Sequence, residues 1–171
     1  MNKKVNNAFN EQVRFEYYSA YIYLGMSEWL QKHGYIGASQ WMITQVREEI
    51  AHGQGLAQFV QLHDGDVEYG TIEGVTTEYD SILDVFEKAL AHEQEVTERI
   101  NKLAEVCEKE KDYAARIFLD WYIMEQVEEE DNQRNNIAAV KLCGDDRSAL
   151  INLDKELGMR TFTWPVIPYL E

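Results

Sequence analysis

The first proline of the chain is Pro165, so no helix-breaking residue interrupts the long segment before it. Over that segment, apolar residues recur at helical spacing in four long stretches and one short stretch. The stretches cover about residues 5–33, 37–63, 80–108, 112–142 and 146–157. Only a few residues join the first stretch to the second and the third to the fourth, so each of these pairs must be antiparallel. The pattern predicts an all-α fold.

The connection between the second and third stretches, about residues 65–79, is much longer than the others. At roughly 3.3 Å per residue it can span about 50 Å, whereas a helix of about 28 residues is about 42 Å long. It can therefore cross the bundle lengthwise, so that the second and third helices run parallel. We expect one domain over residues 1–171, an up-down-down-up four-helix bundle with one long crossover and a short fifth C-terminal helix. The apolar residues of the crossover could pack on a helix face or on a neighbouring subunit: Val67, Tyr69, Ile72 and Val75.

Each of the four predicted core faces carries a carboxylate near its middle, although large apolar residues lie one or two turns away. Glu16, for example, lies between Phe9 and Tyr23 on the first helix. Because the helices alternate in direction, these midpoints should meet at one level of the bundle. The polar residues on or beside the core rows are Glu16, Glu49, His52, Glu93, Gln126 and Glu129.

Four converging carboxylates in a dry core need compensating charge. Burying an ionised carboxylate costs several kcal/mol unless it is paired, and no Lys or Arg lies on these rows. Two divalent ions would balance the four formal charges, and metal pairs about 3.5–4 Å apart are common in such clusters. Oxygen donors with a single imidazole and no thiolate suit iron or manganese, and suit zinc less well. The pattern predicts a two-metal centre inside one chain.

The charge balance excludes several classes of partner. With 31 acidic and 16 basic residues the chain has a net charge of −15, which repels nucleic-acid backbones and favours cations. The sequence has no apolar run near the ~18 residues of a membrane span and no secretion signal, so we expect neither a membrane partner nor export. Cys107 and Cys143 lie far apart without a CxxC motif, which indicates reduced thiols and a cytoplasmic protein.

The chain resembles bacterial non-haem ferritins, of the ferritin-like di-iron family, in four segments that occur in order: RFEYYSAYIYL, REEIAH, HEQ and WYIMEQVEEE. The match covers nearly the whole chain, including the crossover and the short fifth helix. Ferritin-like bundles use a Glu from each of two helices and a Glu-x-x-His motif from the other two. The resemblance implies that Glu16, Glu49 and His52 hold one iron and that Glu49 bridges to a second. The implied further ligands of the second iron are Glu93, Gln126 and Glu129.

Two departures from sister families bear on this centre. Where bacterioferritins have a second Glu-x-x-His motif, the chain has Gln126-x-x-Glu129. One imidazole is therefore lost, and we expect the second iron to be held more loosely and to leave as product. Where bacterioferritins have a haem-binding Met, the chain has Ile50, so we expect no haem.

Three further acids lie one position from the core rows, rotated about 100° around their helices. They are Glu48, Glu125 and Glu128. In the family that the chain resembles, this group forms a third iron site toward the interior of the shell. The alternative interpretation is a solvated helix face.

Tyr23 lies two turns after the acid of the first helix and should reach the level of the centre. There it either orients Glu129 or supplies an electron; otherwise it is a core tyrosine with a satisfied hydroxyl. His92 is adjacent to Glu93 but off its row, so we expect His92 at the surface. The apolar tail, residues 161–169, should pack either on its own chain or on another subunit.

The resemblance implies a hollow shell of twenty-four copies that stores iron. Fe(II) would be oxidised by dioxygen or peroxide at the two-iron centre and then hydrolysed to a ferric oxyhydroxide mineral inside, so the chain would be a ferroxidase. Two alternatives stay open: a di-iron peroxidase or oxygenase that stores no iron, and a metal-free helical scaffold. Aromatic residues on the first two helices exceed the needs of one core and favour a homo-oligomer: Tyr17, Tyr18, Tyr21 and Trp29.

Overall fold

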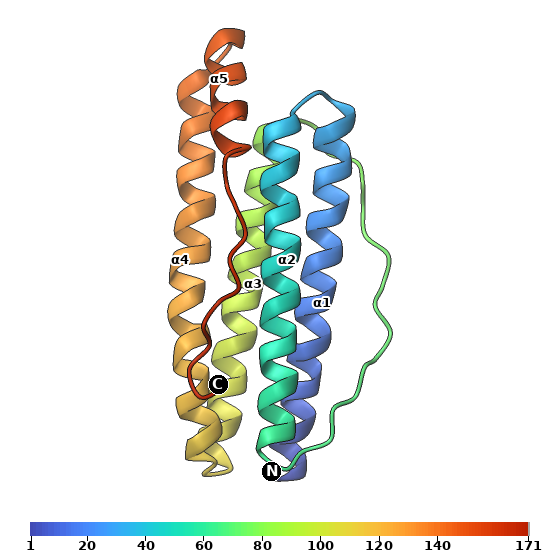
Figure 1. Cartoon of the computed structure of the whole chain (residues 1–171), viewed down its shortest axis with the longest axis vertical. Coiled ribbons are helices and arrows are strands. Elements are labelled where there is room, and N and C mark those ends of the chain that lie inside the picture. Colours follow the sequence, from blue (N-terminus) through green and yellow to red (C-terminus); the bar gives the residue numbers. More distant parts are fainter. Residues whose placement is uncertain (171) are drawn as a thin grey trace.

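The computed structural model describes residues 1–170, and this part of the chain forms five helices and no strand. Their bounds differ from the expected ones by at most two residues: α1 Lys3–Lys32, α2 Ile36–Leu62, α3 Ile82–Lys109, α4 Tyr113–Cys143 and α5 Arg147–Leu157. Figure 1 shows that α1 and α4 run one way and α2 and α3 the other way. The predicted all-α, up-down-down-up bundle with one long crossover and a short fifth helix is confirmed. None of the helices in residues 1–170 has the length and apolar character of a membrane span.

Side-chain caps explain where several helices begin and end. The Asn2 side chain accepts hydrogen bonds from the first free backbone N–H groups of α1. Ser81 caps α3 by accepting from Asp84 N at 3.0 Å, and the Asp84 carboxylate accepts in return from Asp80 N at 3.1 Å. This pair works as a capping box whose return bond is shifted by one residue. α4 ends at Gly144, where a φ of 51° favours glycine.

The crossover lies along α1 of its own chain (Figure 1). The Asn10 side chain holds its first part, because Nδ2 donates to Asp66 O at 2.8 Å and Oδ1 accepts from Glu68 N at 3.0 Å. Near its other end, a Cβ on Gly25 would overlap Thr76 O, so only glycine permits this close approach. Of the two placements open from the sequence, the crossover has the one on a helix face.

The hydrophobic core is divided into two clusters. One cluster, around Phe9, Phe59 and Phe118, fills the end of the bundle that holds the N-terminus, and the other, around Met26 and Phe86, fills the opposite end. Buried polar residues lie between them: Glu16, Gln45, Glu49, His52, Glu93, Gln126 and Glu129. The midpoints of the four long helices therefore meet at one polar layer.

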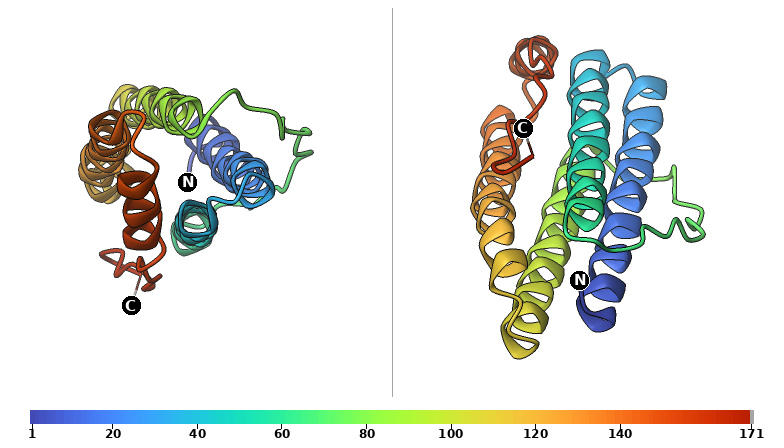
Figure 2. Two further views of the ribbon diagram at one scale, coloured as in Figure 1. Left: turned by 90° about the horizontal axis from the view of Figure 1, so that it is seen from above. Right: turned by 60° about the horizontal axis from the view of Figure 1, so that its bottom comes forward.

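The two helix pairs, α1 with α2 and α3 with α4, meet mainly through α1 and α3. On the other side, α2 and α4 have no Cα pair within 8 Å among the described residues, and α5 contacts both helices. The groove between α2 and α4 is filled by the segment 158–170, which runs down it from α5 (Figure 1; Figure 2 gives two further views). Ile167 is 7% exposed, and Gln58 Nε2 donates to Leu170 O at 3.2 Å. The tail thus packs on its own chain, one of the two placements open from the sequence.

The position of α5 is set by a cap that it provides to another helix. Tyr35, at the N-terminus of α2, offers no side-chain cap. Instead the Asp154 carboxylate of α5 accepts from Gly37 N at 3.0 Å and from Ala38 N at 2.9 Å. A Cβ on Gly37 would overlap the backbone of Asp154, so the two helices touch at this point. This contact anchors the start of the tail beside the N-terminal end of α2.

Candidate metal centre

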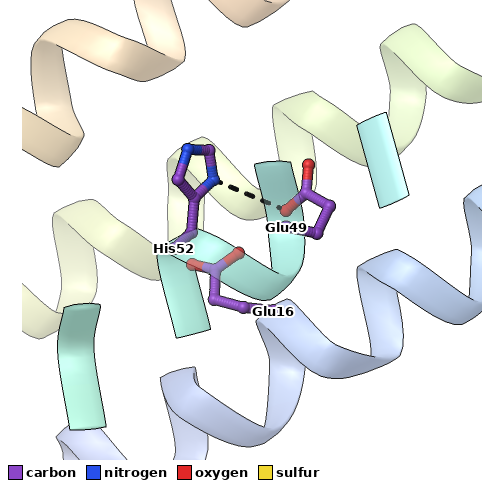
Figure 3. A group of neighbouring side chains, drawn as sticks. All are labelled: Glu16, Glu49 and His52. Atoms are coloured by element: carbon purple, nitrogen blue, oxygen red, sulfur yellow. Dashed lines mark ion pairs between the residues drawn. The ribbon is translucent and has the colours of Figure 1, made fainter. Parts of the chain in front are cut away.

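Three buried side chains from two helices converge in the polar layer (Figure 3). They are Glu16 of α1 and Glu49 and His52 of α2, and one ligand atom of each lies within 4.8 Å of the others. His52 Nδ1 is 3.7 Å from Glu49 Oε2. A second group of the same compactness joins His52 to Glu125 and Glu129 of α4. His52 therefore lies between two sets of carboxylate oxygens.

The first group keeps several buried atoms free of protein partners. Glu16 Oε2, Glu49 Oε1 and His52 Nε2 are inaccessible to solvent and have no hydrogen-bond partner among residues 1–170. Buried polar atoms are nearly always satisfied, so a set of three unpaired acceptors needs a further group. Carboxylate oxygens and an imidazole nitrogen are suitable ligands for iron or manganese. The donor set therefore fits a divalent metal ion.

Glu93 of α3 has its two oxygens occupied by neighbours. Tyr23 donates its hydroxyl to Glu93 Oε1, and Gln126 Nε2 donates to Glu93 Oε2 at 3.0 Å. The Tyr23 hydroxyl also accepts from Gln133 Nε2 at 3.4 Å. The expectation that Tyr23 orients Glu129 is thus wrong: its acceptor is Glu93, because α1 packs against α3 and not against α4.

Two glutamines that the sequence analysis missed hold the other acids in place. Gln12 Nε2 donates to Glu16 Oε1 at 2.9 Å, and Gln45 Nε2 donates to Glu129 Oε2 at 2.9 Å. Gln12 lies four residues before Glu16, and Gln45 lies four residues before Glu49, so both are on the buried helix faces. The available signal was an amide one turn before Glu16 and another one turn before Glu49, although Gln45 bonds to Glu129 across the bundle and not to Glu49. These bonds direct the remaining oxygens of the acids toward the centre.

Burial is the main influence on the ionisable groups of the centre. It raises the pKa of Glu16 to about 7, raises the pKa of Glu93, and raises the pKa of Glu49 and Glu129 well above the usual value. It lowers the pKa of His52 to about 4, so the ring is neutral at pH 7 and can bind a metal. The carboxylates repel one another when ionised. They therefore hold protons unless metal ions replace these protons.

Comparison with known proteins agrees with this geometry. A model of the ferritin-like domain matches residues 6–143. A bacterial non-haem ferritin from Staphylococcus aureus is 36% identical over 162 residues, which cover 95% of this chain and 98% of that protein. The chain belongs to the ferritin family. Membership implies iron binding and supports a role in iron storage.

Solved ferritins have nearly the same backbone. An engineered closed form of the Archaeoglobus fulgidus ferritin matches with a TM-score of 0.94 and 41% identity, covering 95% of this chain and 99% of that chain. The open-pore ferritin of the same hyperthermophilic archaeon matches with a TM-score of 0.93 and 40% identity, over 94% of this chain and 99% of that chain. The ferritin fold therefore extends over nearly the whole of this chain.

Among residues 1–170, the three acids considered for a third ferritin iron site do not form a group whose ligand atoms all lie within 4.8 Å of one another, although Glu48 and Glu128 lie near enough to raise the pKa of Glu125. Glu48 Oε2 lies 2.6 Å from Arg160 Nη2 of the tail. Glu125 Oε1 is 3.9 Å from His52 Nε2, and burial raises the pKa of Glu125 to about 7. Glu128 is exposed. Glu125 is thus placed beside the centre itself, whereas Glu48 already has a cationic partner.

His92 does not lie at the surface as expected. It is 8% exposed, its Nε2 lies 2.8 Å from Ser19 Oγ, and its ring is 5.5 Å from the Phe15 ring. Because α3 packs against both α1 and α4, two of its faces are covered. The heptad row through Glu93 identifies only one of these buried faces, and His92 lies on the other. Burial lowers the pKa of His92 to about 4, so this ring is neutral at pH 7.

Proposed function

We propose that this ferritin is a ferroxidase that also stores iron in the cytoplasm. Its substrate is Fe(II), and dioxygen or peroxide accepts the electrons at a two-iron centre inside each chain. The ferric product hydrolyses to an oxyhydroxide mineral inside a hollow shell of twenty-four copies. The observation that carries the proposal is the set of three unpaired, buried ligand atoms on Glu16, Glu49 and His52.

The two irons would have different ligands. Glu16, Glu49 and His52 hold the first iron. Glu49 would also bridge to the second iron. Burial is the main cause of the raised pKa of Glu49, and the carboxylates of Glu93, Glu16 and Glu129 raise it further. Their proximity to Glu49 supports the bridging role. Further ligands of the second iron are Glu93, Gln126 and Glu129. Because this second set has no imidazole of its own, it holds its ion less tightly.

The protein side chains prepare the oxidation in three ways. Anionic oxygen ligands favour the ferric over the ferrous ion, because hard donors stabilise the higher charge. Tyr23 is a positioning residue, because its hydroxyl fixes one oxygen of Glu93; supply of an electron by Tyr23 is a second possible role. The neutral His52 ring is available without first losing a proton.

Assembly into a shell is supported by apolar side chains that the single chain leaves at its surface. Large apolar residues rarely lie exposed in groups unless another molecule covers them. The large apolar residues exposed on α1 and α4 are Tyr21, Leu24, Tyr113, Ile117, Met124, Val127 and Leu142.

The decisive experiment combines size-exclusion chromatography with anaerobic Fe(II) titration and stopped-flow exposure to oxygen. We expect a large particle that oxidises about two irons per chain in a fast phase. Glu49→Ala and His52→Ala should abolish that phase, whereas Glu105→Ala, which removes an exposed Glu of α3, should retain it.

The other outcomes identify the alternatives. A monomer or dimer that retains its metals and stores no iron would indicate a di-iron peroxidase or oxygenase. A Glu49→Ala protein that is more stable than the original chain and oxidises iron as before would indicate a metal-free scaffold.

A further inference from the structure

One positive side chain of the tail lies in the acidic groove between α2 and α4. Arg160 Nη2 lies 2.6 Å from Glu48 Oε2, and Nη1 donates to Gln45 Oε1. The guanidinium carbon is 4.3 Å from the centre of the Trp41 ring. In sequence order these partners are Trp41, Gln45 and Glu48, at positions i, i+4 and i+7 of α2. They therefore form one row along the helix. The row binds the guanidinium through a carboxylate, an amide and an aromatic face.

Arg160 is held in this groove by the structure on either side of it. Before it, Asp154 caps α2 and anchors α5. After it, Ile167 is buried in the core cluster beside α2 and α4. The arginine therefore reaches Glu48 from a fixed segment of backbone. It is partly buried, as is Glu48.

We infer that Arg160 is an internal cation that takes the place of a third metal ion at Glu48 and limits the centre to two ions per chain. This inference rests on the proposed function, because it concerns the ions that the proposed centre binds.

The charges around Glu48 support this assignment. Three acids of α4 lie near this row of α2: Glu129 Oε2 accepts from Gln45 Nε2 at 2.9 Å, Glu125 Oε1 is 3.9 Å from His52 Nε2, and Glu128 directly precedes Glu129. Among residues 1–170, Arg160 is the one Lys or Arg side chain that forms an ion pair with any of these four acids. A divalent ion on Glu48 would stand within about 5 Å of the guanidinium, where like charges repel. The ion could bind there only if Arg160 moved away.

Arg160 also acts on the centre through Gln45. A guanidinium has donors and no acceptor, so it can bind only the carbonyl oxygen of the Gln45 amide. The amide nitrogen must then point the other way, where it donates to Glu129 Oε2 at 2.9 Å. Arg160 is thus a positioning residue for a proposed ligand of the second iron.

The test counts bound Zn²⁺ by calorimetry on metal-free shells, because Zn²⁺ is not oxidised. We expect two ions per chain at the centre of the original protein and one additional ion per chain in Arg160→Gln. The double variant Arg160→Gln with Glu48→Gln should lose the additional ion, and Arg160→Lys should not gain it. Anomalous diffraction from Zn²⁺-soaked crystals of Arg160→Gln should place the new ion at Glu48. Ions bound at subunit contacts add the same number to the count of every variant, so they do not affect the differences between variants.

Arg116→Gln is the matched control. Arg116 pairs with Glu108 at 3.2 Å and with Asp120, and both acids are exposed. Its replacement removes the same charge and frees two carboxylates away from the groove. It should add no ion.

Glu48→Gln alone provides a second test that leaves the tail in place. We expect the same ion count as in the original protein, because Arg160 already occupies Glu48. Loss of one ion in this variant, or no gain in a folded Arg160→Gln shell, would overturn the inference and leave the two-iron centre standing. If Glu49→Ala binds as many ions per chain as the original protein, the proposed function is refuted, and the inference is refuted with it.

Discussion

Replacing Glu16 by Gln should flatten the pH dependence of stability in the metal-free protein. Burial raises the pKa of Glu16 from 4.5 to about 7, whereas the carboxyl ionises near 4.5 in the unfolded chain. Between these pH values the folded state keeps a proton that the unfolded state releases. The stabilising contribution of this carboxyl is therefore complete below pH 4.5 and is lost as the pH rises through 7.

The size of the effect follows from the shift. One pKa unit corresponds to about 1.4 kcal/mol, so Glu16 should change the free energy of unfolding by about 3 kcal/mol over this range. His52 acts in the opposite direction, because its pKa falls from 6.5 to about 4 and its contribution grows as the pH rises from 4 to 6.5. His52 is present in both proteins, so a comparison of the original chain with Glu16→Gln isolates the carboxyl.

The assay is chemical denaturation of chelator-treated protein at pH 5 and pH 8, at constant ionic strength. From pH 5 to pH 8, the free energy of unfolding of the original chain should fall by about 2 to 3 kcal/mol more than that of Glu16→Gln. Glu105→Gln, with an exposed side chain, should follow the original chain. Parallel pH profiles for the original chain and Glu16→Gln would show that this carboxyl ionises freely in the folded protein, which would refute the electrostatic basis of the centre.

Three further predictions concern single contacts. Tyr23→Phe leaves Glu93 Oε1 without its donor and should slow the fast phase of Fe(II) oxidation about tenfold, as for the loss of one buried bond to a charged group; an unchanged stopped-flow rate would contradict this role. Asp154→Ala removes the cap of α2 and should lower the free energy of unfolding by about 1 kcal/mol in denaturant titrations; an unchanged free energy would contradict this role of the carboxylate. Gly37→Ala places a Cβ against the backbone of Asp154 and should displace α5, so limited proteolysis should cut near residue 158 faster than in the original chain; equal cleavage rates would count against the close contact.

The helices and the level of the centre were accessible from the sequence because they depend on local information. A spacing of 3.6 residues identifies the buried face of each helix, and connection lengths determine which helices can be parallel. Glu16, Glu49 and His52 could therefore be placed together before any coordinates were known. The one-turn spacing that brings Gln12 below Glu16 is of the same kind, and it was overlooked.

Contacts between helices could not be predicted in the same way. Tyr23 bonds to Glu93, His92 is covered by α1, and Arg160 meets Gln45 across 115 positions of sequence. Periodicity gives the face of a helix, but it does not give the axial shift or rotation of that helix against its neighbour. A hydrogen bond tolerates a few tenths of an ångström, whereas one helical turn is about 5.4 Å. Residue pattern alone thus determined one buried face of each long helix and the level of the centre, and packing of the whole bundle determined which further faces are covered and which atoms meet there.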